Sequence, residues 1–242
     1  IQLLYKMTLS GKTIISFDKF YESTTGKIPV SLVSETWFLE NLMELNKQDF
    51  EKFKRILDVL FGLIIFVIFI LALPFVAFAI KITDKGPIFY RQKRMGKNGK
   101  IFDLIKFRSM IIDAEKEKSG WSKPEEKDAR ITFVGRILRK IRIDEIPQVW
   151  NILQGNMSFV GPRPERPNFV QELTKIVPHY SMRHLVKPGL TGWSQINFGD
   201  ASARDAQKKL QYDLYYIKNR SLLLDIIILL KTIMVILSRT GK

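Results

Sequence analysis

Two adjacent carboxylates, Asp144 and Glu145, are the side chains in this sequence whose type and spacing best suit phosphoryl chemistry. An aspartate carboxylate can attack phosphorus to form an acyl phosphate, and a hard cation such as Mg²⁺ can bridge carboxylate oxygens and phosphate. Neighbouring helical residues project about 100° apart, so one carboxylate could attack while the other orients. The structural alternative is a helix N-cap at Asp144, with both charges favouring the helix dipole.

The composition closes several other routes. The chain of 242 residues holds no cysteine and two histidines, His179 and His184. The absence of thiols excludes disulfide scaffolds, thiolate zinc sites, iron–sulfur clusters and a cysteine nucleophile, and two imidazoles do not make a histidine-rich zinc centre. A carboxylate mechanism with Mg²⁺ needs neither residue type. With 46% hydrophobic residues, the chain can also bury a sizeable core.

Basic side chains could supply the cationic clamp that phosphoryl transfer requires. The candidates are Lys106, Arg108, Arg130, Arg139 and Arg163. Arg163 stands between two prolines that restrict its backbone, and Arg139 stands five residues before the acidic pair. Each of these side chains could instead be solvated at the surface, and Arg130 could form a local salt bridge.

The net charge of +15 is unevenly distributed. Residues 1–52 hold 6 basic and 7 acidic side chains, which leaves 33 basic and 17 acidic side chains for the rest of the chain. Such a basic surplus suits nucleic acid, an anionic membrane surface or a phosphorylated substrate. The neighbouring apolar segments favour a membrane.

Residues 59–80 contain no charged side chain across 22 positions, which as a helix would reach about 33 Å, roughly one hydrocarbon thickness. Basic residues flank this run on both sides, as in cytoplasmic loops. Pro74 should bend the helix inside the bilayer. Both features predict a re-entrant hairpin that bends at Pro74, and the alternative is an ordinary kinked span.

Residues 222–237 form a second apolar stretch, which is interrupted by Asp225 and Lys231. Charges at bilayer mid-depth are costly, so this stretch should not span. A narrow polar stripe recurs at helical spacing: Ser221, Asp225, Thr232 and Arg239. The stripe is typical of an amphipathic helix that lies along the membrane interface, and the alternative is a buried core helix.

The sequence between the two apolar stretches predicts the elements that position the site. Residues 88–108 predict a β-hairpin with an Asn98-Gly99 turn. Residues 115–127 are densely charged and predict a surface loop. A helix should begin at Asp144, tolerate a proline in its first turn and end at Gly155. Two rigid turn clusters follow, at residues 161–164 and 187–193.

The order of these motifs resembles the bacterial sugar transferases, that is, the monotopic polyprenyl-phosphate phosphoglycosyl transferases. The resemblance runs from about Phe53 to the end of the chain. It rests on the apolar segment with its basic flanks and on residues 106–110, 144–148, 155–164, 188–193 and 212–216. Residues 1–45 are similar to the stretch just upstream in long members of this family, and the start at Ile1 suggests a fragment.

The resemblance implies transfer of a sugar-1-phosphate from a UDP-sugar to undecaprenyl phosphate, with Mg²⁺ and release of UMP. The reaction would take place at the cytoplasmic face of the bacterial inner membrane and begin the assembly of an exopolysaccharide, capsule or O-antigen-type glycan. Asp144 would be the nucleophile, and Glu145 its partner at the metal or the acceptor phosphate. Arg139 and Arg163 would hold phosphates. Many relatives have serine before the hairpin proline, where this chain has Leu73.

These patterns predict an α+β, helix-rich, membrane-associated fold. We expect residues 1–52 to be a linker or the remnant of an upstream domain, residues 53–85 a re-entrant membrane hairpin, and residues 86–242 a cytoplasmic catalytic domain with an interfacial C-terminal helix. The remaining alternatives are direct single displacement, with Asp144 as base or metal ligand, and a non-enzymatic adaptor that binds anionic lipid. No nucleic-acid reader motif is present. The sequence leaves the sugar open, and the oligomeric state too, including a homo-oligomer.

Overall fold

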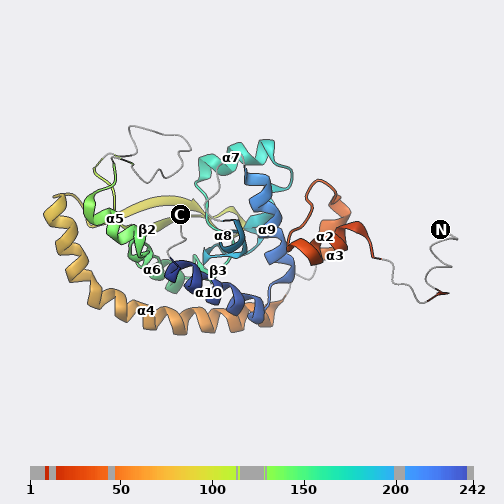
Figure 1. Cartoon of the computed structure of the whole chain (residues 1–242), viewed down its shortest axis with the longest axis horizontal. Coiled ribbons are helices and arrows are strands. Elements are labelled where there is room, and N and C mark those ends of the chain that lie inside the picture. The colour runs from red at the N-terminus through yellow and green to blue at the C-terminus, as the bar shows by residue number, and fades with distance from the viewer. Residues whose placement is uncertain are drawn as a thin grey trace.

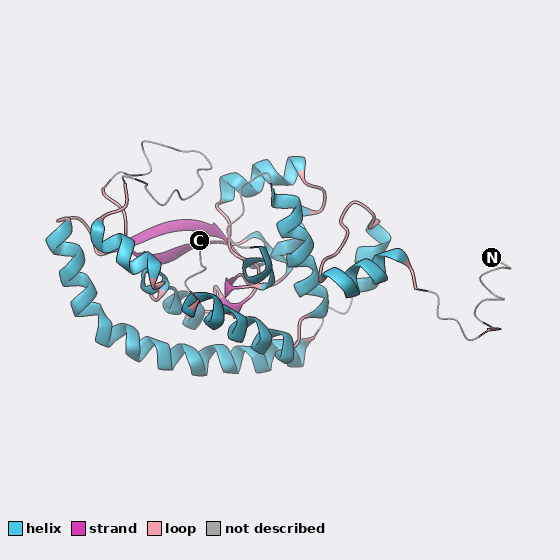
Figure 2. Cartoon of the chain, viewed as in Figure 1, coloured by secondary structure: helices cyan, strands magenta, loops and turns pink. Residues whose placement is uncertain are grey.

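A computed structural model of the chain describes residues 9–10, 15–42, 47–112, 114, 128, 130–198 and 205–238. Figures 1 and 2 show that helices dominate the described chain and that the strands are few. The helices are α2 Phe17–Thr25, α3 Glu35–Leu42, α4 Gln48–Thr83, α5 Phe133–Lys140, α6 Gln148–Leu153, α7 Pro167–Ile176, α8 Trp193–Phe198, α9 Ala206–Asn219 and α10 Leu222–Leu237. The 3-10 helices in the described chain are η2 Lys97–Gly99, η3 Ile143–Glu145 and η4 Tyr180–Leu185. The strands are β1 Phe89–Met95, β2 Ile101–Phe107, β3 Ser158–Val160 and β4 Gly189–Thr191.

The apolar segment forms one long helix, α4, which curves beneath the rest of the domain (Figure 1). Its 36 residues correspond to about 54 Å, and it is the one helix in the described chain that is long and apolar enough to cross a membrane. The helix continues through Pro74, so it is a curved rod rather than two antiparallel arms. A proline removes one backbone hydrogen bond and bends a helix without having to end it. That both ends lie on one face of the membrane stays a prediction.

One side of α4 packs against α5 and α6. A Cβ at Gly62 would lie 2.9 Å from the Leu153 side chain, so α4 and α6 approach closely at this glycine. Further along α4, Phe69 joins a buried cluster with Phe107 and Val149. The opposite side of α4 is apolar and exposed, with side chains that include Phe61, Ile64, Ile68, Leu71, Phe75, Phe78 and Ile82.

The predicted hairpin is confirmed. Strands β1 and β2 pair antiparallel, with Tyr90 opposite Lys106, and Asn98 and Gly99 both adopt positive φ at the turn. A second pair, β3 and β4, is parallel and short. The expected loop at residues 115–127 lies outside the described residues.

The main core includes the N-terminal segment, residues 15–42. Ile28 is fully buried, and it shares one apolar cluster with Leu210 and Leu214 of α9. In Figure 1, α2 and α3 lie beside α9. The predicted boundary at residue 52 stays a prediction, but the described part of this segment packs against the domain that follows it.

Two members of the predicted polar stripe on α10, Asp225 and Thr232, face the protein, whereas Ser221 is exposed. Asp225 is buried, and its carboxylate accepts hydrogen bonds from Lys54 and from the Tyr216 hydroxyl. Thr232 Oγ1 lies 2.7 Å from Thr191 Oγ1. The outward side of α10 is instead apolar, with exposed Leu223, Ile226, Leu230, Ile233 and Met234. Arg239, the last member of the stripe, lies outside the described residues.

Candidate active site

The acidic pair lies in the 3-10 turn η3, not at the start of a helix. Arg142 has φ of +58° and turns the chain into η3, and Pro147 then occupies the N-cap position of α6. The expected N-cap role of Asp144 is therefore wrong, because the N-cap is Pro147 and the helix begins at Gln148. The predicted end of the helix is close, since Gly155 follows α6 with φ of +84°. Asp144 and Glu145 are both buried residues, with 7% and 9% of their surface exposed.

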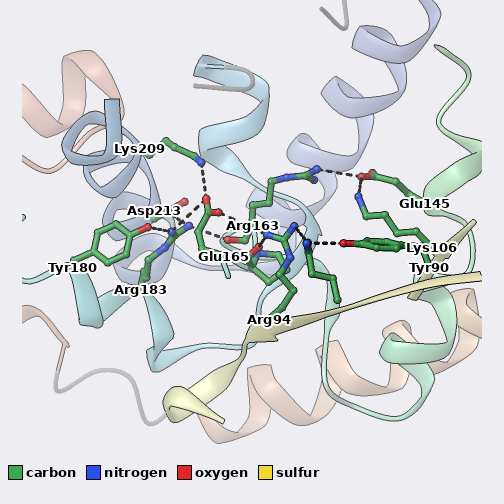
Figure 3. Close-up of polar contacts among 12 residues, drawn as sticks. Tyr90, Arg94, Lys106, Glu145, Arg163, Glu165, Tyr180, Arg183, Lys209 and Asp213 are labelled. Carbon is green, nitrogen blue, oxygen red and sulfur yellow. Dashed lines mark hydrogen bonds and ion pairs between the residues drawn. The ribbon is translucent and has the colours of Figure 1, made fainter. Parts of the chain in front are cut away.

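Glu145 is the charge-neutralised member of the pair. Its Oε1 accepts hydrogen bonds from Lys106 Nζ at 2.7 Å and from Arg163 Nη2 at 3.2 Å (Figure 3). Burial raises the pKa of Glu145, but the charges of Lys106 and Arg163 outweigh it and hold that pKa well below its usual range. Glu145 is therefore an ionised carboxylate that fixes two cations.

Asp144 differs from its neighbour. Its Oδ1 is buried and has no hydrogen-bond partner among the residues that the structure describes. Burial raises the pKa of Asp144, the charge of Glu145 raises it further, and Lys106, Arg139 and Arg142 act in the opposite direction. Asp144 thus has one oxygen without a partner in the described chain, and it lies within reach of three cationic charges that favour its ionised form.

The structure brings three of the five predicted basic residues to the acidic pair. Lys106 and Arg163 contact Glu145 directly. Arg139 donates from Nε to Ser109 Oγ at 2.8 Å, and its charge acts on Asp144.

The other two predicted basic residues are occupied elsewhere. Arg130 forms an ion pair with Asp128 at 2.6 Å. Its charge acts on Arg139, so Arg130 is linked to the acidic pair through Arg139. Arg108 turns toward the end of α4, where its Nη2 donates to the Asp84 carbonyl oxygen at 3.0 Å. That Arg108 holds substrate phosphate stays a prediction, and its Nη1 has no hydrogen-bond partner among the described residues.

Arg163 is presented by a clamped loop, residues 161–166, which we call the arginine loop. Arg183 Nη2 donates to the Arg163 carbonyl oxygen at 3.0 Å, and Arg94 Nη1 donates to the Pro164 carbonyl oxygen at 2.9 Å. The next residue, Glu165, forms a buried ion pair with Lys209 at 2.8 Å. Figure 3 shows these contacts running from α9 across the loop to the hairpin.

Sequence reasoning missed several neighbours of the pair. Arg142 stands next to the turn, and its charge lowers the pKa of both carboxyl groups. Gln148 is buried, and its Nε2 has no partner in the part of the chain that the structure describes. Tyr90 faces Lys106 across the hairpin and accepts a hydrogen bond from Gln92. Tyr90 could have been found from the hairpin register, because it stands opposite Lys106. Gln148 could have been found because it follows Glu145 by three residues in the sequence.

The residues present fit a metal ion shared with substrate rather than a closed metal site. Within the described ranges no group of three or more acidic, histidine or cysteine side chains could hold a metal. Asp144 Oδ1 has no hydrogen-bond partner among the described residues, so it would be open to a cation, and Glu145 adds a second carboxylate. Mg²⁺ is commonly held by one or two carboxylates together with substrate phosphates. Asp144 and Glu145 therefore suit Mg²⁺ delivered with a phosphorylated substrate.

Comparison with known proteins gives a consistent result. A family model described as bacterial sugar transferase matches residues 50–239. The chain is 36% identical over 99% of its length to a UDP-N-acetylgalactosamine-undecaprenyl-phosphate N-acetylgalactosaminephosphotransferase of Aeromonas hydrophila. It is 42% identical over 65% of its length to the UDP-glucose:undecaprenyl-phosphate glucose-1-phosphate transferase of Xanthomonas campestris pv. campestris, and 37% identical over 74% to that of Escherichia coli (strain K12). The chain covers 56%, 33% and 39% of these three relatives.

Proposed function

Because this chain belongs to the bacterial sugar transferase family, we propose that it transfers a sugar-1-phosphate from a UDP-sugar to undecaprenyl phosphate and releases UMP. The observation that carries the proposal is that the two carboxylates of η3 differ in their contacts. Glu145 holds two cations, and Asp144 keeps a buried oxygen without a partner in the described chain.

The reaction follows from these roles in two steps. In the first step, the Asp144 carboxylate attacks the β-phosphorus of the UDP-sugar, an oxygen–phosphorus bond forms, and the bond to the bridging oxygen breaks so that UMP leaves. In the second step, a phosphate oxygen of undecaprenyl phosphate attacks the same phosphorus, and Asp144 leaves as a carboxylate. Each substrate meets the same aspartate in turn, so ping-pong kinetics are expected.

The surrounding residues stabilise the charge that develops on the transferred phosphoryl group. Lys106 and Arg163 are held by Glu145, and Arg139 approaches from α5. Preorganised cations in a buried site act strongly because little water screens them. Asp144 and Glu145 would hold Mg²⁺ with the substrate phosphates, and the ion would supply further charge neutralisation there.

Membrane attachment would place this site at the depth of a lipid carrier's phosphate. The outer sides of α4 and α10 are apolar and exposed. Helix α5 contacts both α4 and η3. Phe133 and Ile137 of this helix and its C-cap residue Ile141 are also exposed apolar side chains. Such a surface suits the boundary between headgroups and acyl chains. We place the domain at the cytoplasmic face of the inner membrane because basic residues flank the apolar run of α4 on both sides.

The test is a screen of UDP-sugars for UMP release by the detergent-solubilised protein, with undecaprenyl phosphate and Mg²⁺. Release with at least one sugar, its loss in Asp144→Asn, and transfer of the labelled sugar phosphate to the lipid would support the proposal. Binding to anionic liposomes without UMP release from any UDP-sugar would instead favour the lipid-binding adaptor.

A further inference from the structure

The N-terminal segment, residues 15–42, lies outside the matched family region of residues 50–239, yet buried contacts join it to the catalytic domain. Ile28 is fully buried in the main core. The Glu22 carboxylate accepts a hydrogen bond from Lys218 Nζ of α9 at 2.6 Å. These contacts fix α2 and α3 to α9, so the segment can influence what α9 and its neighbours support.

The first line of contact runs from Gly26 to the arginine loop. Trp193 Nε1 donates to the Gly26 carbonyl oxygen at 2.8 Å, and the indole ring stacks on Tyr215 with centroids 5.5 Å apart. Gly26 ends α2 with φ of +64°, and a Cβ there would lie 3.1 Å from the indole. Gly192 is the residue before Trp193, and a Cβ on Gly192 would lie 2.2 Å from the Gly161 carbonyl oxygen. The backbone that carries Trp193 therefore contacts the start of the arginine loop.

The second line of contact reaches the same loop from the other end. The ring of buried Phe38 on α3 lies 4.5 Å from the His179 ring, measured between centroids. His179 has φ of +60° and turns the chain into η4. From η4, Arg183 donates to the Arg163 carbonyl oxygen at 3.0 Å. Phe38 thus supports the turn that leads to the arginine clamp.

We propose that the N-terminal segment is a positioning element for the arginine loop. Through Trp193 and Phe38 it fixes the position from which Arg163 meets Glu145, and both aromatic residues are positioning residues. The catalytic consequence rests on the proposed function. A displacement of about 1 Å in a catalytic group can lower a rate by about 10²-fold. Contacts of the N-terminal segment that fix the position of Arg163 can therefore affect the reaction rate. The alternative is that the segment adds stability to the whole domain and nothing specific to the loop.

Hydrogen exchange separates these two possibilities without any assay of activity. The amides of Gly161 and Gly189 donate to the carbonyl oxygens of Thr191 and Pro162, at 2.9 and 3.0 Å. Trp193→Phe keeps an aromatic ring on Tyr215 and removes the N–H donor. We expect exchange at Gly161 and Gly189 to rise about tenfold, with the β1 and β2 amides unchanged, because local opening exposes only the loosened unit. The matched control is Lys19→Gln on the exposed side of α2, which should leave all of these amides unchanged.

A kinetic cycle then tests whether the effect passes through Arg163. Trp193→Phe should lower kcat for UMP release about tenfold in the wild-type background and less than about twofold in an Arg163→Met background, because coupled residues are not additive. Phe38→Leu, which keeps the core filled, should behave in the same way and provides a second route should Trp193→Phe not fold. Unchanged exchange at Gly161 and Gly189, or equal losses in both backgrounds, would overturn the positioning role. An inactive wild-type protein would overturn the proposed function, while the exchange result would still support or overturn the role of the segment.

Discussion

Lys106 Nζ lies 2.7 Å from Glu145 Oε1, whereas Asp144 Oδ1 has no hydrogen-bond partner among the residues that the structure describes. These two adjacent, buried carboxyl groups therefore have pKa values that are shifted in opposite directions. The pKa of Glu145 is lowered, since Lys106 and Arg163 outweigh its burial, and the pKa of Asp144 is raised by burial and by its neighbour. This difference leads to the predictions below.

Asp144→Asn should abolish activity and stabilise the fold. When the pKa of a carboxyl group is raised in the folded state, the folded protein loses stability as the pH rises through that pKa. Ionised Asp144 therefore lowers the stability of the protein at neutral pH. The amide removes that cost and also removes the nucleophile. We expect UMP release to fall about 10³-fold or more and the Tm at pH 7.5 to rise. A lower Tm would contradict the burial of an ionised carboxylate at this position.

The pH dependence of the first half-reaction should report Asp144. The nucleophile must be ionised, so single-turnover UMP release should decline as pH falls through a pKa above the ordinary aspartate value of about 4. Glu145, with its lowered pKa, stays ionised across this range. Lys106→Met should move the acid limb to higher pH, because Lys106 lowers the pKa of Asp144. An acid limb that stays at the same pH in the variant would show that another group limits the rate.

Substitutions of Arg108 and Arg163 should have different effects, although the sequence predicts both residues as phosphate ligands. Arg163→Met removes a cation from Glu145, and we expect kcat/KM for the UDP-sugar to fall about 10²-fold. Arg108→Met removes the pairing with Asp84 at the end of α4, so it should lower the Tm and leave the KM of the folded protein for the UDP-sugar unchanged. Asp84→Asn is the matched variant and should share that phenotype. A tenfold rise in KM for Arg108→Met would return Arg108 to the substrate site.

The absence of cysteine makes the membrane topology directly testable. Lys52→Cys and Lys85→Cys place single thiols near the two ends of α4, at residues that are exposed. A re-entrant α4 predicts that a membrane-impermeant maleimide labels both positions from the same side of sealed inverted vesicles. Labelling of the two positions from opposite sides would show that α4 spans the membrane.

The sequence predicted local features well because their causes are local. The hairpin follows from alternating strands and an Asn98-Gly99 turn that accepts positive φ. The acidic pair and Arg163 were visible because their residue types and rigid neighbours are unusual together. Lys106 was found with Arg108, yet the two side chains separate where β2 ends, and only the tertiary position of Asp84 decides that Arg108 turns away.

Other features of the fold depend on tertiary contacts that the sequence does not show. Helical spacing places Asp225 and Thr232 on one side of α10, but it does not say whether that side meets water or protein. The partners that draw Asp225 inward, Lys54 and Tyr216, come from other helices. In the same way, nothing local in residues 15–42 indicates that Gly26 meets Trp193, which lies far along the chain.

The central proposal is a covalent bond between Asp144 and the phosphorus of the transferred sugar phosphate. The most direct measurement is mass spectrometry of the protein after incubation with a substrate UDP-sugar and Mg²⁺ in the absence of undecaprenyl phosphate. We expect one sugar phosphate on the peptide that contains Asp144, formed together with UMP, absent from Asp144→Asn and discharged when the lipid is added. Release of UMP only when undecaprenyl phosphate is present, with no adduct on the protein, would contradict the covalent route and favour direct displacement.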